Sequence, residues 1–333
     1  MARRRRSSGA AGAQAFGRRV AAAALAGATT LAAAGCEVCE TYGVSVEVGP
    51  SIGDVDARAI DRAGDGWIVV GDAGAIVVGA PGEWSRRESP SAADLRGVAI
   101  DPGGGVGVIV GAGGVLLRTD DHGARWSSVA SPTARDLHGV SGFFGRFVAV
   151  GDGVVLRSDD GAAWEAVPGP FEGLRLRAVV DAGTEVWIAG DGGALLRGTG
   201  SAWELVESGV SGDLIGLSRA TSVAITRDGV ILRQDELRWE VALVLERPLV
   251  ALDPSGRWVV DVDGAVHHLY VPEAGNNAEA TALRATTSVP VGALGLDEDG
   301  VAVAVGGAGA WARLTFGVVD ARACRRREEQ PIF

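Results

Sequence analysis

Gly71-Asp-Ala-Gly-Ala-Ile-Val-Val78 is a glycine-rich turn followed by an apolar strand, and the chain repeats this unit. The clearest further copies are Gly111-Ala-Gly-Gly-Val-Leu-Leu-Arg118, Gly151-Asp-Gly-Val-Val-Leu-Arg157 and Gly190-Asp-Gly-Gly-Ala-Leu-Leu-Arg197. Three weaker copies follow at 227–233, 262–268 and 306–311. Repetition at a fixed period indicates stacked modules, each of which buries its apolar surface against the next.

The last glycine of each turn marks the period. These glycines are Gly74, Gly114, Gly153, Gly193, Gly229, Gly264 and Gly309, so the seven units have steps of 35 to 45 residues. Each unit reads as four strands; in the second unit they fall at 95–100, 106–110, 115–119 and 126–129. The glycines supply the positive φ angles that two-residue hairpin turns demand. The pattern predicts an all-β fold, a single seven-bladed β-propeller with four-stranded blades over 55–322.

Tryptophan supports the same frame. One tryptophan opens the fourth strand of each of the first five units: Trp84, Trp126, Trp164, Trp203 and Trp239. A large ring at a fixed position in each blade fills the gap between neighbouring blades near the rim. Blades are therefore expected to begin near residues 55, 94, 136, 175, 213, 248 and 291.

A propeller must join its first blade to its last. Two strand-like segments lie outside the seven units, at 44–48 and 314–322. We expect one of them to complete the terminal blade. This leaves 36–54 as an N-terminal linker with a closing strand and 323–333 as a C-terminal tail.

Residues 1–35 read as a signal peptide. Arginines at 3–6 and 18–19 precede an apolar run at 20–34, which is shorter than the ~20 residues of a membrane-spanning helix. The segment 31–36 resembles a lipobox, which predicts lipidation of Cys36 and a periplasmic, outer-membrane or cell-surface lipoprotein. Cleavage after Ala34 would instead give a secreted protein, and the paired arginines leave twin-arginine export open.

The cysteines allow two arrangements. If Cys36 carries lipid, Cys39 and Cys324 remain as a pair near the two ends of the mature chain, and in an oxidising compartment they would form a disulfide. The alternative is a Cys36–Cys39 bridge with Cys324 free.

The charge of the mature chain limits its partners. Of 31 arginines, six lie in residues 1–35, so 25 remain against 42 acidic residues, a net charge of −17. Such a surface repels nucleic acid and anionic lipid. We expect an unidentified protein partner, no nucleic acid, membrane contact only through the lipid anchor, and a monomer.

Two tryptophans follow a recognisable motif. Its first copy comprises Thr119, Asp121, Gly123 and Trp126, and its second, one residue shorter, comprises Ser158, Asp160, Gly161 and Trp164. These segments resemble the Asp-box hairpins of BNR-repeat propellers, and the chain is most similar to the propellers related to photosystem II assembly factors. The resemblance covers roughly 55–316. It implies that the two aspartates stabilise their hairpins. We do not expect them to bind calcium, because one or two carboxylates fall short of the six to eight oxygen ligands that Ca²⁺ takes.

Sialidases share this fold and motif, so a glycan-binding or glycosidase-type propeller is the alternative. That resemblance would require a tyrosine nucleophile, and only Tyr42 and Tyr270 exist. The four histidines suggest neither a catalytic triad nor a metal site. No cofactor or metal is expected, and the sequence favours a non-enzymatic scaffold.

One asymmetric feature suggests where binding would occur. Alignment of the inner strands places Arg58, Arg96, His138 and Arg177 at one equivalent position in units one to four. Units five to seven carry Ile215, Val250 and Gly292 there. The position lies near the channel mouth, and guanidinium groups there would bind a carboxylate or an acidic protein segment. The alternative is that these side chains only pair with aspartates in nearby loops: Asp61, Asp72, Asp152 or Asp191.

Overall fold

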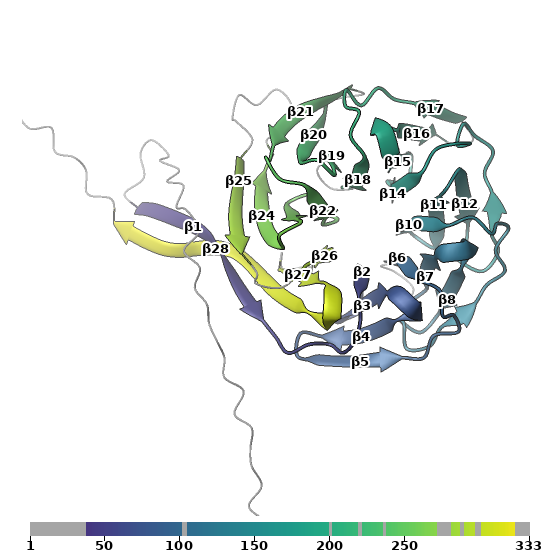
Figure 1. Ribbon diagram of the computed structural model, residues 1–333, viewed down its shortest axis with the longest axis horizontal. Coiled ribbons are helices and arrows are strands. Elements are labelled where there is room, and N and C mark those ends of the chain that lie inside the picture. Colours follow the sequence, from purple (N-terminus) through teal and green to yellow (C-terminus); the bar gives the residue numbers. More distant parts are fainter. Residues whose placement is uncertain are drawn as a thin grey trace, which may run out of the picture.

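The computed structural model describes residues 38–101, 105–199, 202–218, 222–235, 238–271, 281–286, 290–296 and 301–323. They form seven four-stranded antiparallel sheets arranged as blades around a common centre (Figure 1). The predicted seven-bladed β-propeller is therefore confirmed. Among these residues no helix is long and apolar enough to cross a membrane.

The blades follow chain order, and each blade runs from its inner strand to its outer strand. The first four blades are β2 (Ala57–Ala63), β3 (Gly66–Gly71), β4 (Ile76–Ala80) and β5 (Glu83–Arg87); β6 (Leu95–Ile100), β7 (Gly107–Gly111), β8 (Leu116–Thr119) and β9 (Ser127–Ser128); β10 (Leu137–Phe143), β11 (Arg146–Gly151), β12 (Val154–Ser158) and β13 (Glu165–Ala166); and β14 (Leu176–Asp181), β15 (Val186–Gly190), β16 (Leu195–Thr199) and β17 (Ala202–Leu205).

The fifth and sixth blades are β18 (Leu214–Leu217), β19 (Val223–Thr226), β20 (Val230–Asp235) and β21 (Arg238–Val244); and β22 (Leu249–Leu252), β23 (Trp258–Asp261), β24 (Ala265–Tyr270) and β25 (Thr281–Thr286). The seventh comprises β26 (Ala293–Leu296), β27 (Ala302–Val305), β28 (Trp311–Ala323) and β1 (Val38–Val48). The inner strands begin within about two residues of the expected blade starts.

The core consists of apolar layers between adjacent blades. Strand β7, for example, is buried along its whole length, and its Ile109 packs with Ile68 and Val70 of the preceding blade. A blade is covered on both faces by its neighbours, so its strands carry continuous apolar runs instead of alternating ones.

The tryptophans lie where their spacing predicts, at or next to the start of each outer strand. Trp126 packs against Ile68 of the preceding blade. Trp239 makes an edge-to-face contact with Trp187, with the ring centroids 5.6 Å apart. Trp84 reaches the seventh blade, where its ring centroid lies 6.2 Å from that of Trp311. Each of these rings joins its blade to the one before.

The propeller closes with a strand from each end of the chain. The last sheet has the order β1-β28-β27-β26, so the N-terminal strand is the outermost strand of the seventh blade. Both predicted segments take part: Val44 pairs with Phe316, and Val48 pairs with Ala312. Strand β27 pairs with β28 only as far as Leu314. Beyond that point β1 and β28 continue as a two-stranded ribbon that projects from the blade (Figure 1).

The turns between the second and third strands agree with expectation in four blades. In blades one, two, four and seven each turn is a three-residue 3₁₀ segment: η1 (Asp72–Gly74), η2 (Ala112–Gly114), η3 (Asp191–Gly193) and η4 (Gly307–Gly309). In each of them the N–H of the next residue bonds to the carbonyl of the first residue of the segment, and both residues between have positive φ, so the predicted two-residue hairpin turn is present. The positive φ angles were correctly placed, and in η1 they fall on Ala73 (52°) and Gly74 (71°). Gly74 has no room for a side chain, since a Cβ atom there would lie 1.9 Å from the carbonyl oxygen of Ser91.

Candidate binding site at the mouth of the channel

A cavity of about 490 Å³ opens at the centre of the propeller, on the face that bears the turns between second and third strands. It is lined by Ala57, Arg58, Arg96, Asp136, His138, Arg175, Arg177, Ile215, Arg227, Val250 and Gly292. All seven residues aligned from the repeats line this one cavity. The sequence alignment therefore located the mouth and the position within each blade that faces it.

Two of the arginines are held by an aspartate of the adjoining turn in their own blade. Arg58 contacts Asp72 through Nε and through Nη2, the latter 2.8 Å from Oδ2. Arg177 and Asp191 repeat this arrangement, with Nη2 2.9 Å from Oδ2. The hydrogen bond from Arg58 lowers the pKa of Asp72, and the same bond raises that of Arg58. The Arg58–Asp72 pair is therefore ionised near neutral pH, and both arginines line the cavity.

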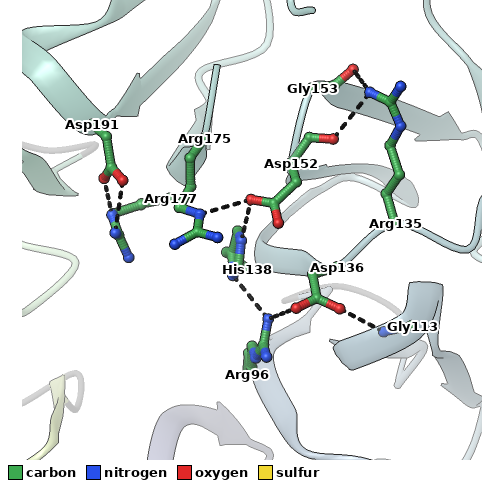
Figure 2. Close-up of polar contacts among 10 residues, drawn as sticks. All are labelled: Arg96, Gly113, Arg135, Asp136, His138, Asp152, Gly153, Arg175, Arg177 and Asp191. Carbon is green, nitrogen blue, oxygen red and sulfur yellow. Dashed lines mark hydrogen bonds and ion pairs between the residues drawn. The ribbon is translucent and has the colours of Figure 1, made fainter. Parts of the chain in front are cut away.

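Arg96 has a different partner because the turn of its blade carries Ala112 where blades one and four have aspartate. Its Nη1 lies 2.7 Å from Oδ2 of Asp136 in the next blade and 3.2 Å from Nδ1 of His138 (Figure 2). The other oxygen of Asp136 accepts a hydrogen bond of 2.8 Å from the backbone N–H of Gly113. The bond from Gly113, followed by that from Arg96, lowers the pKa of Asp136.

His138 continues this network into the fourth blade. Its Nε2 lies 2.8 Å from Oδ1 of Asp152, and the same oxygen accepts a bond of 2.9 Å from Nε of Arg175 (Figure 2). Burial acts to raise the pKa of Asp152, but the bonds from His138 and Arg175 outweigh it, so the pKa is lowered. Polar contacts thus run without a break from Arg96 to Arg175.

The expected alternative, pairing with loop aspartates, is correct for Asp72, Asp152 and Asp191 and wrong for Asp61. Asp61 lies near the far end of β2, where its Oδ2 accepts a bond of 2.7 Å from the backbone N–H of Ile100. Being paired does not remove the arginines from the mouth, because their guanidinium groups line the cavity.

Sequence reasoning missed three charged residues of the mouth: Asp136, Arg175 and Arg227. Asp136 and Arg175 directly precede the inner strands of their blades. In blades one, two and five an aspartate also directly precedes the inner strand: Asp56, Asp94 and Asp213. This recurrence could have predicted Asp136 as a residue of the mouth. The position of Arg227, whose Nε lies 3.7 Å from Oδ2 of Asp213, could not be predicted from the sequence.

The mouth has a basic half and an apolar half. Blades one to four supply His138 and all but one of the arginines, while blades five to seven supply Ile215, Val250 and Gly292 together with Arg227 of blade five. Apart from His138, no lining residue of this cavity is aromatic among the residues that the structure describes. The site therefore presents hydrogen-bond donors opposite an aliphatic wall.

The two predicted Asp-box turns lie between the third and fourth strands of blades two and three. Oδ1 of Asp121 is 2.8 Å from the Thr119 hydroxyl and accepts a bond of 2.9 Å from the backbone N–H of Arg125. Gly123 takes a φ of 84°, and its N–H donates to Thr119. The carboxylate thus serves the turn itself.

The shorter copy has the same plan. Oδ1 of Asp160 accepts bonds of 2.8 and 3.0 Å from the backbone of Ala162 and Ala163, and the N–H of Gly161 donates to Ser158. Trp164 donates its indole N–H to the carbonyl of Gly161, 2.9 Å away. Both aspartates act within their own hairpins.

Several predictions fall outside the described part of the chain. Cys36 and Cys324 lie beyond it, as does the side chain of Cys39, so lipidation and the disulfide stay predictions. The backbone of residue 39 pairs with Arg322. Across the described residues, no group of three or more His, Cys, Asp or Glu side chains is placed to hold a metal ion.

Comparison with known proteins shows the fold. No family model and no curated protein matches the sequence. A streptogramin B lyase is similar in structure, with a TM-score of 0.70, 12% identity, and coverage of 82% of this chain and 98% of the other. YCF48 bound to a D1 peptide is similar with a TM-score of 0.61 and 18% identity, and the match covers 81% of this chain and 96% of the other. The WD40 propeller domain of Doa1 is similar with a TM-score of 0.64 and 12% identity, and the match covers 83% of this chain and 97% of the other. These proteins have different roles, so the likeness establishes a propeller and leaves the function open.

Proposed function

We propose that this chain is an exported, non-enzymatic scaffold that binds an acidic segment of a partner protein at the channel mouth. The observation that carries the proposal is the arc of guanidinium groups from blades one, two and four, each paired with a carboxylate. Arginine held in this way offers planar, directed donors that suit carboxylates. An arc on an otherwise acidic chain would select an acidic segment that the rest of the surface repels.

The structural neighbours support a binding role by analogy. One of them is a propeller solved with a peptide bound. The hydrogen bonds of the turns at Asp121 and Asp160 support the proposal that these are Asp-box turns and that the chain is a BNR-repeat propeller. Since another neighbour is a lyase, the fold itself does not decide between scaffold and enzyme.

The glycan-binding alternative has less support. Sugar sites commonly use aromatic faces, whereas the described tryptophans of the rim pack between blades. Tyr270 is exposed, but it ends β24 and is absent from the residues that line the mouth.

Export and anchoring rest on the sequence of residues 1–36. A lipid on Cys36 would hold the propeller at a membrane surface while the mouth stays free for a partner. Mass spectrometry of the chain purified from its native host tests this: a diacylated N-terminal cysteine supports the anchor, and an unmodified chain beginning at residue 35 supports secretion.

Crosslinking in the native host, followed by mass spectrometry, tests the scaffold role. The mouth variant replaces Arg58, Arg96 and Arg177 by Gln. The control makes the same charge change at three exposed arginines outside the cavity, Arg86, Arg238 and Arg313. We expect the mouth variant alone to lose a partner that crosslinks through an acidic segment. Identical partners for both variants, or turnover of a sialoside or glucan by the wild type, would overturn the proposal.

A further inference from the structure

His138 carries a single proton whose position its neighbours determine. A guanidinium group can only donate hydrogen bonds, and an ionised carboxylate can only accept them. Nδ1 faces Nη1 of Arg96 at 3.2 Å, so it accepts; Nε2 faces Oδ1 of Asp152 at 2.8 Å, so it donates. The imidazole in this arrangement is therefore neutral, with its proton on Nε2.

In this state every arginine that lines the cavity is already offset by an aspartate, and Asp56 and Asp94, which also act on Arg58, add further negative charge. Each arginine that lines the cavity is matched by one aspartate: Arg58 by Asp72, Arg96 by Asp136, Arg175 by Asp152, Arg177 by Asp191 and Arg227 by Asp213. A carboxylate that entered would add a negative charge with no counterpart. One further positive charge would offset it, and Nδ1 of His138, which accepts from Arg96 and carries no proton in this arrangement, is a site in the cavity lining where a proton can add.

A proton on Nδ1 would turn the contact with Arg96 into two donors facing each other. The nearest carboxylates are already engaged. Asp136 accepts from Arg96 and Gly113, and Asp152 accepts from His138 and Arg175. A carboxylate in the cavity would give the new N–H an acceptor that it does not share with these donors. A carboxylate has two oxygens and suits a pair of such donors.

We propose that the channel mouth binds one carboxylate together with one proton, the carboxylate accepting hydrogen bonds from Nδ1 of His138 and Nη1 of Arg96. The proton comes from solvent and returns to it when the ligand leaves, so no covalent bond to carbon forms or breaks. The inference rests on the proposed function only in taking a carboxylate as the ligand. It adds that His138 is the residue that couples binding to pH.

The charged groups that face His138 come from three blades. They are Arg96 on β6, Asp136 before β10, Asp152 in the turn after β11, and Arg175 and Arg177 at the start of the fourth blade. Linked uptake of one proton makes the affinity rise about tenfold for each unit by which pH falls, as long as the free imidazole is neutral.

The first experiment observes the imidazole nitrogens of His138 by NMR in the full chain, with sodium acetate as the probe and sodium chloride at equal ionic strength as the reference. Without acetate we expect the neutral form with the proton on Nε2. Acetate at constant, mildly acidic pH should convert it to the doubly protonated form. Identical spectra in acetate and chloride, or a proton on Nδ1 in the free protein, would overturn the inference.

A matched pair of variants gives the second readout. His138→Gln can still donate to Asp152 and accept from Arg96, but it cannot take up a proton. It should bind acetate weakly and with no dependence on pH between about 5 and 8. The control, His122→Asn, alters a histidine that does not line the mouth and should keep the wild-type pH dependence.

The outcomes separate the two proposals. Acetate binding with proton uptake, but no partner lost on mutating the mouth, supports the inference and sinks the scaffold role. Partner binding at the mouth with no dependence on pH or on His138 supports the scaffold role and overturns the inference. Since wild-type NMR alone decides the proton position, the test survives if His138→Gln does not fold.

Discussion

The backbone N–H of Gly113 donates a hydrogen bond of 2.8 Å to Oδ1 of Asp136, and this bond crosses from the second blade to the third. The same contact recurs at three other blade junctions, where Asp56 accepts from Ala308, Asp94 from Ala73 and Asp213 from Gly192, each at 3.1 Å. The donor is always the first residue of positive φ in a 3₁₀ turn. Aspartate before an inner strand therefore clasps the preceding blade.

Asp94 offers the cleanest test of this clasp because it does not line the mouth. Asp94→Ala removes the acceptor of the Ala73 N–H and should lower the free energy of unfolding by about 1 kcal/mol. Asp94→Asn retains an oxygen at Oδ1 and should cost less. Chemical denaturation of both variants checks the order. Asp65→Ala, at an exposed turn, is the control; a cost at Asp65 equal to that at Asp94 would contradict the clasp.

Removal of β1 should destabilise the seventh blade. A chain that begins at residue 50 lacks the strand that pairs with β28 from residue 312 to 323, so the last blade loses its outermost strand and exposes an edge. We expect a lower melting temperature and self-association through that edge. Thermal unfolding and size-exclusion chromatography, compared with a chain that begins at residue 38, measure both. Unchanged melting and elution would show that closure does not depend on β1.

The repeats made the fold predictable, because each turn and each tryptophan appears several times at one spacing. The same alignment brought Arg58 and Gly292 to one mouth, although they are far apart in the chain. Closure was only half predictable: both terminal segments read as strands, but nothing in either showed that β28 would be third and β1 fourth in one blade.

The contacts within the site were less predictable. The pairing of Arg58 with Asp72 follows from one blade, but Arg96 reaches Asp136 only because its own turn carries Ala112. Such cross-blade contacts depend on how neighbouring blades are set against each other. The sequence of a single repeat does not contain that information.

Trp126 and Trp164 occupy the same place in successive blades but differ at the indole nitrogen. Nε1 of Trp164 donates to the carbonyl of Gly161, 2.9 Å away, whereas Nε1 of Trp126 is buried without a partner. Trp164→Phe should therefore lower the free energy of unfolding by about 1 kcal/mol more than Trp126→Phe, because only the former breaks a hydrogen bond. Urea denaturation of the two variants measures the difference. The reverse order would contradict this account of the turn.

Asp121 should make the stability of the protein depend on acid. Burial acts to raise its pKa, but hydrogen bonds from Arg125 and Thr119 outweigh it and lower the pKa to about 2. An unfolded aspartate titrates near ~3.9. A carboxyl group whose pKa is lowered by folding contributes stability that is present above the unfolded pKa and is lost as pH falls through the folded one. The loss attributable to Asp121 should therefore fall between about pH 4 and 2.

Asp121→Asn tests this directly, since the amide cannot ionise. Above about pH 5 the variant should be less stable than the wild type, and the difference should shrink as pH falls towards about 2, where the wild-type carboxyl group is also neutral. Denaturant midpoints measured across that range give the difference at each pH. Asp65→Asn, at an exposed turn, should follow the wild type throughout. A difference between Asp121→Asn and the wild type that stays constant with pH would show that the side chain stabilises the hairpin without its charge.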